Sequence, residues 1–214
     1  MPLPDLPPDV SLDVSPDVSP DVSLEVSLDV SPGSPRPTQR VDDVTDPSTA
    51  CGEPLRRCAL SLADEAATDA FAARLAAALL PGHVVWLCGT LGAGKTTLVR
   101  GLLRALGHEG PVRSPTFTLL EPYAFARFAV YHFDLYRFAS AHEWHDAGFD
   151  DYFGKTGVCL VEWPEQAAGA VPAPDVRIAL AFSGEPGATS QRSMTLEAWT
   201  QAGLRCVNAI VDGC

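Results

Sequence analysis

Apolar residues recur with two different periods along residues 55–199, and the two periods alternate along the chain. Short runs rich in Val, Ile, Leu, Phe and Tyr predict buried strands, whereas apolar residues spaced three or four positions apart predict helices. The predicted strands cover residues 55–62, 83–88, 117–120, 129–136, 158–163, 176–182 and 193–199. The predicted helices cover residues 64–80 and 96–106, and residues 142–153 are expected to be helical or turn-like.

The helix predicted over residues 64–80 has recognisable ends. It is rich in Ala, the residue with the highest helix propensity. Ser61 or Asp64 can cap its start, and Pro81–Gly82 ends it. Because strands and helices alternate, we expect an α/β fold with three layers, in which a mostly parallel sheet has a small antiparallel part.

The first 50 residues have a different character. From Asp9 the chain repeats a tetrad six times, in which an acid, Val and Ser are followed by Leu or Pro. The segment contains ten acidic residues against Arg36 and Arg40. Such a sequence cannot bury enough apolar surface to offset its chain entropy. We therefore expect residues 1–50 to be a disordered acidic low-complexity extension and residues 51–214 to form one folded domain.

The charge balance and the cysteines exclude several classes of protein. The extension accounts for −8 of the net charge of −12, so the folded part is mildly acidic and shows no basic face for direct tRNA binding. No apolar stretch approaches the roughly 18 residues of a membrane span, and no signal peptide is recognisable. The six cysteines lie far apart, which favours structural thiols over zinc ligands or disulfides. We expect a cytoplasmic protein without membrane contact.

Residues 89–96 match the pattern G-x-x-x-x-G-K-[ST] of a phosphate-binding loop. A predicted strand precedes them and a predicted helix follows, so a phosphate would lie at a helix N-terminus. The glycines let backbone N–H groups converge on phosphate oxygens, Lys95 brings a positive charge, and the Thr96 hydroxyl can ligate a bound Mg²⁺. The predicted nucleotide contacts are Gly89, Leu91, Gly92, Ala93, Gly94, Lys95, Thr96 and Thr97.

Two carboxylates are the candidate catalytic residues. Glu162 ends an apolar strand, which is where a phosphate-loop enzyme delivers the acid beside the phosphates. We therefore predict that Glu162 either helps to hold the metal or positions the attacking water. Asp134 lies within an apolar and aromatic strand, where its charge needs a partner such as Arg137, Lys95 or a metal-bound water. His132, two residues earlier, is expected to be an ordinary core histidine.

Four sequence blocks carry a resemblance to a known family. They are the phosphate loop Gly-Thr-Leu-Gly-Ala-Gly-Lys-Thr-Thr, Ser-Pro-Thr-Phe-Thr at 114–118, Tyr-His-Phe-Asp-Leu-Tyr-Arg at 131–137, and Leu-Val-Glu-Trp-Pro-Glu at 160–165. In this order and at these separations they resemble the TsaE family, also called YjeE. The resemblance covers roughly residues 55–185 and leaves out the acidic repeat.

The resemblance implies a bacterial phosphate-loop ATPase, with ATP and magnesium as cofactors, needed for the threonylcarbamoyl modification of tRNA adenosine. Such proteins do not transfer the group; they act on the TsaD and TsaB pair, while TsaC supplies threonylcarbamoyl-adenylate, so tRNA would be met only through the complex. Family magnesium ligands fall on Thr96 and Glu162, and the aspartate of the third block falls on Asp134. Base contacts fall loosely on residues 61–65, and Trp163 is expected to pack near the nucleotide.

Two other readings use the same loop. A small-molecule or nucleotide kinase needs an acceptor pocket and usually an arginine-bearing lid, and no lid-like insertion is visible. A non-hydrolysing, ATP-gated assembly module would make Glu162 structural. A GTPase is excluded, because the only lysines are Lys95 and Lys155 and neither lies in a guanine-reading Asn/Thr-Lys-x-Asp element.

Overall fold

The computed structural model describes residues 26–27, 52–154, 156–183 and 191–212. The disorder predicted for residues 1–50 therefore falls almost entirely outside the described residues. Within that segment only β1 (Val26–Ser27) is described. Apart from β1, the fold is formed by residues 52–154, 156–183 and 191–212.

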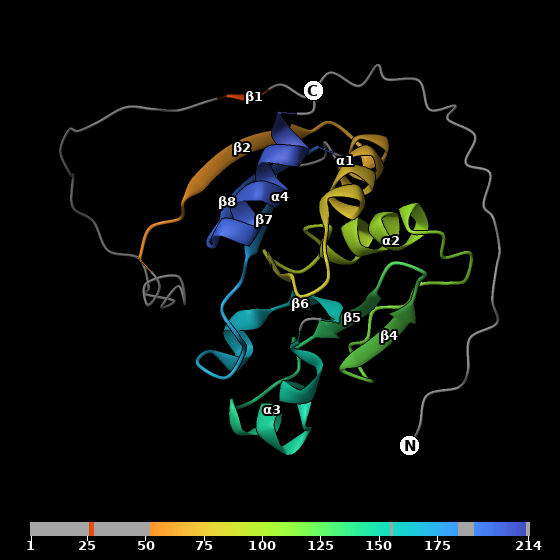
Figure 1. Ribbon diagram of the computed structural model, residues 1–214, viewed down its shortest axis with the longest axis vertical. Coiled ribbons are helices and arrows are strands. Elements are labelled where there is room, and N and C mark those ends of the chain that lie inside the picture. The colour runs from red at the N-terminus through yellow and green to blue at the C-terminus, as the bar shows by residue number, and fades with distance from the viewer. Residues whose placement is uncertain (1–25, 28–51, 155, 184–190, 213–214) are drawn as a thin grey trace.

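One mixed sheet passes through the whole molecule (Figure 1). Its strands are β2 (Arg56–Leu62), β3 (Val84–Cys88), β4 (Leu120–Ala124), β5 (Ala129–Asp134), β6 (Gly157–Glu162), β7 (Val176–Phe182) and β8 (Arg192–Ala198). They lie in the order β1-β2-β8-β7-β3-β6-β5-β4. The central strands β7, β3, β6 and β5 are parallel, and the pairs toward both edges are antiparallel. The predicted α/β class, with a parallel centre and an antiparallel part, is confirmed.

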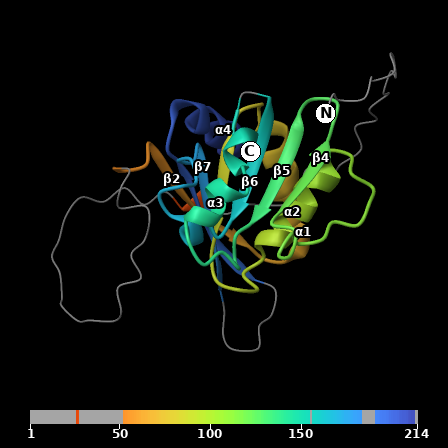
Figure 2. The ribbon, with the colours of Figure 1, turned by 90° about the horizontal axis from the view of Figure 1, so that it is seen from below.

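Helices cover both faces of this sheet. They are α1 (Glu65–Ala78), α2 (Lys95–Ala105), α3 (His142–Asp146) and α4 (Gln201–Val211), with 3-10 turns η2 (Phe149–Tyr152) and η3 (Pro164–Ala167). The larger core lies between the sheet and α1, α2 and α4. A second, aromatic core lies between the opposite face of β5 and β6 and the segments α3, η2 and η3. Strands β4, β5 and β6 lie side by side in Figure 2. No described helix has the length and apolar character that crossing a membrane requires.

The first long helix agrees with its prediction. Asp64 is the N-cap of α1, and its side chain accepts a hydrogen bond from the Ala67 N–H at 2.8 Å. The predicted apolar stripe of Phe71, Leu75 and Leu79 is fully buried against the sheet. The helix is therefore held by a cap at its start and by one buried face along its length.

The strand predicted over residues 117–120 is placed wrongly. The chain turns at Leu119, which has a φ of 64°, and β4 begins only at Leu120 and runs past Pro122. Phe117 is 82% exposed rather than buried in a strand. Pro122 is tolerated because β4 is an edge strand, where a missing N–H does not break a central ladder.

Helix α4 was not predicted. Thr200 caps it by accepting from the Gly203 N–H at 3.0 Å, and Cys206, Val207 and Ile210 are buried along one side. A Cβ on Gly203 would lie 1.8 Å from the Asp175 carbonyl oxygen, so this glycine lets the helix approach the sheet closely. The helix completes the cover over β7 and β8.

Candidate nucleotide-binding site

The phosphate-binding loop connects β3 to α2 and has the backbone that its glycines predict. Gly89, Gly92 and Gly94 have φ angles of 132°, 78° and 107°, in the region that side chains disfavour. A Cβ on Gly89 would lie 2.2 Å from the Leu180 carbonyl oxygen of β7. The loop therefore packs directly against the neighbouring strand, and a side chain at residue 89 would displace it.

Lys95 opens α2 and is almost completely buried. Its Nζ donates to the carbonyl oxygens of Gly89 at 2.6 Å and Thr90 at 3.0 Å, and lies 3.8 Å from the centre of the Trp163 ring. Burial lowers the pKa of Lys95, and nearby carboxylates, chiefly Glu162, act in the opposite direction. The Lys95 side chain thus folds back into the loop and lies against Trp163. That Trp163 packs near a bound nucleotide stays a prediction.

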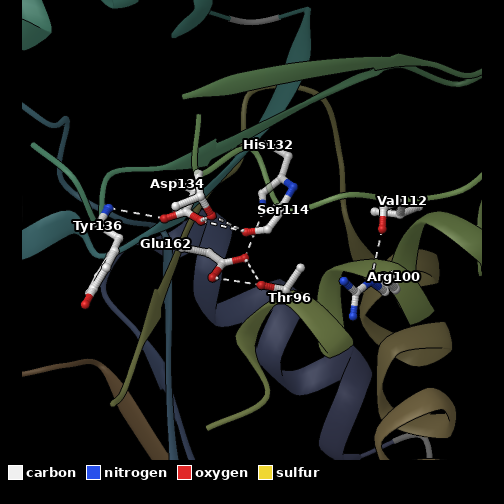
Figure 3. A network of polar contacts seen from close by, with 9 residues as sticks. Thr96, Arg100, Val112, Ser114, His132, Asp134, Tyr136 and Glu162 are labelled. Carbon is white, nitrogen blue, oxygen red and sulfur yellow. Dashed lines mark hydrogen bonds and ion pairs between the residues drawn. The ribbon is translucent and has the colours of Figure 1, made fainter. Parts of the chain in front are cut away.

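Glu162 connects the loop helix to the sheet. Its carboxylate accepts from the Thr96 hydroxyl at 2.9 and 3.2 Å, and its Oε1 lies 2.9 Å from the His132 Nε2 (Figure 3). Because a carboxylate only accepts, the hydrogen of the His132 ring is assigned to Nε2. His132 is therefore more than the ordinary core residue we expected: it holds the candidate metal ligand from the side opposite Thr96.

Asp134 is also buried, and its hydrogen-bonded partners are not cations. The Ser114 hydroxyl donates to its Oδ2 at 2.6 Å, and the Tyr136 N–H donates to its Oδ1 at 3.1 Å (Figure 3). The Thr116 hydroxyl also donates to Oδ2, at 2.7 Å. Of the two cations expected to compensate its charge, Lys95 is close enough for Asp134 to act on it and raise its pKa, whereas the Arg137 guanidinium lies over the ring of Phe117, 4.3 Å from its centre. The Ser-Pro-Thr segment is thereby joined to a carboxylate of the site.

Sheet register explains why these side chains meet. Asp134 and Glu162 are direct partners at the ends of the parallel strands β5 and β6. Side chains two residues apart on a strand share a face, so His132 and Asp134 point to the same side. That side faces α2, whose first turn brings Thr96 to Glu162. Side chains alternate between the two faces along β5, so His132 shares a face with Asp134. This alternation was the sequence signal that could have identified His132 as part of the site.

The site opens into a cleft of about 300 Å³. It is lined by most of the predicted contacts, namely Leu91, Gly92, Gly94, Lys95, Thr96, Thr97, Asp134 and Glu162, together with Ser114, Thr116 and Trp163. Ala93 instead lines a second cavity of about 170 Å³ with Leu62, Glu65, Leu180 and Arg192, and Gly94 and Thr97 line both. Gly89 lines neither cavity, because it packs on β7. The second cavity reaches the segment on which base contacts were loosely expected.

The donor set suits a nucleotide and a hard cation. The glycine turn leaves backbone amides free of Cβ atoms around Lys95, as an anion cradle requires. Among residues 52–154, 156–183 and 191–212, no three His, Cys, Asp or Glu side chains are grouped to hold a metal. Mg²⁺ needs no such group, since it is usually bound by one or two protein oxygens with phosphates and waters. Thr96 and Glu162 meet that requirement.

A family model described as "Threonylcarbamoyl adenosine biosynthesis protein TsaE" matches residues 62–193. The chain belongs to the TsaE family. A relative from Haemophilus influenzae, the tRNA threonylcarbamoyladenosine biosynthesis protein TsaE, is 40% identical over 151 residues, which are 68% of this chain and 92% of the relative. The protein of the same name from Bacillus subtilis is 41% identical over 118 residues, covering 55% of this chain and 73% of that protein.

A solved structure supports the same assignment. The crystal structure of Bacillus subtilis YdiB is similar with a TM-score of 0.63 and 29% identity, and the match covers 74% of this chain and 96% of YdiB. The region matched by the TsaE model begins at the last residue of β2 and ends within β8. It therefore includes Lys95, Thr96, Asp134 and Glu162 and leaves out the acidic repeat.

Proposed function

We propose that this TsaE-family chain binds ATP with Mg²⁺ and hydrolyses it slowly, and that this supports repeated cycles of the TsaB–TsaD complex in the threonylcarbamoyl modification of tRNA. Membership of the family supports the pathway. The observation that carries the proposed ATPase is the hydrogen bond from Thr96 of the loop helix to the buried Glu162 of β6, in the cleft that also contains Lys95. We place this activity in the cytoplasm.

Each side chain has a role that follows from its contacts. Bound Mg-ATP supplies the phosphoryl group and the metal charge. The Thr96 hydroxyl donates a hydrogen bond to Glu162. The lone pairs of the Thr96 oxygen therefore remain available to a cation. The Lys95 Nζ, which donates to the Gly89 and Thr90 carbonyl oxygens, would donate to the phosphate oxygens of a bound nucleotide, since these are also acceptors. Asp134 orients the attacking water and, through Thr116, responds to occupation of the cleft.

The base of a bound nucleotide would fit the second cavity, which Leu62, Glu65, Thr68, Ala93 and Leu180 help to line. This cavity adjoins the loop on the side away from Glu162, and Leu62 and Leu180 give it an apolar wall. Glu65 and Thr68 add polar groups at the start of α1. A base in this position and phosphates in the main cleft would lie on either side of Gly94 and Thr97, which line both spaces.

Reconstitution tests the proposed function. TsaB, TsaD and TsaC are incubated with tRNA, threonine, bicarbonate and ATP, with and without this protein, and the modified adenosine formed per TsaD is counted. We expect several turnovers only when the protein is present, and no support from the Lys95→Ala variant. Equal turnover without the protein contradicts the proposal.

A second measurement is the rate of ADP release. We expect ADP release by the protein alone to be slow and to rise when TsaB and TsaD are added. An increase caused by sugars or nucleosides would instead indicate a kinase.

A further inference from the structure

The phosphate-binding loop is held by a second cation besides Lys95. Arg192, the first residue of β8, donates from its Nε to the Ala93 carbonyl oxygen at 3.1 Å. It lines the second cavity together with Ala93 and Gly94, whereas the main cleft is lined by Lys95 and not by Arg192. A nucleotide whose phosphates lie in the main cleft would therefore leave the contact between Arg192 and the loop in place.

Sheet register and an aromatic ring fix the position of Arg192. It lies opposite Phe182 of β7 and opposite Leu62 of β2. Directly opposite residues of an antiparallel pair point to the same face of the sheet, so the side chains of Arg192 and Phe182 lie together. The guanidinium carbon is 4.3 Å from the centre of the Phe182 ring, and Nη1 donates to the Gln191 carbonyl oxygen at 3.1 Å. The guanidinium thus has an aromatic support and a backbone anchor, and its Nε is presented to the loop.

Phe182 and Arg192 together pack along the loop. The Phe182 side chain is 55% exposed, so it contributes little to the hydrophobic core. Its ring reaches the loop instead, since a Cβ on Gly92 would lie 3.5 Å from its Cζ. A Cβ on Gly94 would lie 3.9 Å from the Arg192 Nε. The pair therefore supports the loop from Gly92 to Gly94.

The hydrogen bond from Arg192 determines which way the peptide group between Ala93 and Gly94 faces. This peptide group is trans, so its C=O and N–H lie in one plane and point in opposite directions. The carbonyl oxygen points to Arg192 beside the second cavity, and the Gly94 N–H therefore points the other way. In a regular helix the Ala93 carbonyl would accept from the Thr97 N–H, four residues later. Among the described residues it accepts from Arg192 instead, and the helical ladder begins with the bond from the Leu98 N–H to the Gly94 carbonyl.

We propose that Arg192 is a positioning residue of the phosphate-binding loop, which holds the Ala93 carbonyl and so aims the Gly94 N–H at the phosphates of a bound nucleotide. This inference rests on the proposed binding of Mg-ATP. Successive backbone N–H groups form an anion-binding concavity when they face one point. Lys95 holds two other loop carbonyls but would turn to the phosphates when a nucleotide binds. Arg192 keeps its carbonyl in both states and preserves the shape of the concavity.

Two substitutions of Arg192 in the full chain separate positioning from direct contact with the ligand. Arg192→Met removes the donor and the charge, whereas Arg192→Gln removes the charge but keeps an N–H donor as many bonds from the backbone as Nε. Calorimetry measures the Kd of each chain for Mg-ATP and for Mg-tripolyphosphate, which has phosphates but no base. We expect Arg192→Met to raise both Kd values about 10-fold, the order for one hydrogen bond to a charged group, and Arg192→Gln to restore most of the affinity. Arg104→Met, which removes an exposed charge from the last turn of α2, should leave both Kd values unchanged.

Several results would overturn the proposal. A raised Kd for Mg-ATP alone would mean that Arg192 contacts the base. An equally raised Kd in Arg192→Met and Arg192→Gln would mean that its charge, and not its N–H, acts on the phosphates. A lower melting temperature of nucleotide-free Arg192→Met with unchanged Kd values would indicate a purely structural role. If the unmodified chain binds both probes and Arg192→Met binds them equally well, this inference alone fails; if the unmodified chain binds neither, the proposed function fails with it.

Discussion

At the residue scale, Glu162 joins the loop helix to the sheet through a single buried carboxylate. Glu162→Gln keeps its size and an acceptor for Thr96 but removes the negative charge. We expect ATP turnover to fall at least 100-fold, the order of magnitude for loss of a charge-stabilising group, while the Kd for ATP changes only a few-fold. Single-turnover hydrolysis and nucleotide titration measure the two quantities. Glu109→Gln, on an exposed loop, is the matched control. Unchanged turnover in Glu162→Gln would remove this residue from the mechanism.

His132 acts on the same carboxylate from the sheet side. It is fully buried, and in the described part of the chain its Nδ1 has no hydrogen-bond partner, so Glu162 is its observed polar contact. His132→Leu removes the donor, whereas His132→Gln keeps one at a similar position. We expect His132→Leu to raise the Mg²⁺ concentration for half-maximal ATP turnover about 10–100-fold, as for other residues that position metal ligands, and His132→Gln to restore most of it. Equal Mg²⁺ dependence with a lower melting temperature in both variants would indicate a purely structural role.

At the element scale, the sequence predicted what depends on local pattern. The phosphate loop and Asp64 at the start of α1 were identified because glycine spacing and capping chemistry are local. The edge position of β4 and the partners of Asp134 were not, because they depend on which strands become neighbours. Burial of a carboxylate predicts that it has partners, but neutral hydroxyls from a distant loop serve as well as a cation. Pairwise register is the information that a single sequence lacks.

Three strands are connected by one buried carboxylate on the face of the sheet opposite α1 and α4. Glu197 of β8 accepts from Arg57 of β2 at 2.6 Å and from Arg177 of β7 at 3.1 Å, its register partners on both sides. We expect Glu197→Ala to lower the free energy of unfolding by about 1.5–3 kcal/mol, the range for hydrogen bonds to charged groups. Arg57→Ala should cost less than about 1 kcal/mol because that side chain is largely exposed. Urea unfolding measures both, and equal losses would contradict this ranking.

At the scale of the whole molecule, the candidate site lies at the end of the sheet's central strands, and β1, the described part of the acidic repeat, lies at the sheet's edge. The carboxylates end β5 and β6, whereas β2 is separated from β3 by β8 and β7. We therefore expect a chain beginning at Gly52 to hydrolyse ATP within about twofold of the full chain, since the phosphate-loop contacts all come from later residues. Steady-state ADP release compares the two chains. Loss of turnover in the shorter chain would show that the repeat reaches the site.

The stability of the whole fold should depend on pH through His83, which is almost completely buried just before β3 and accepts from the Leu80 N–H at 3.2 Å through Nδ1. Burial lowers its pKa below the ordinary 6.5; Asp175 opposes this shift and Arg205 adds to it. As the pH falls through 6.5 the unfolded chain takes up the proton first, so stability is lost from there down to the pKa of the folded state, at up to about 1.4 kcal/mol per pH unit. Urea unfolding at pH 7.5 and 5.5 should show this loss reduced in His83→Gln and retained in His108→Gln. An equal loss of unfolding free energy between pH 7.5 and 5.5 in the unmodified chain and in both variants would mean that His83 does not cause the loss of stability in acid.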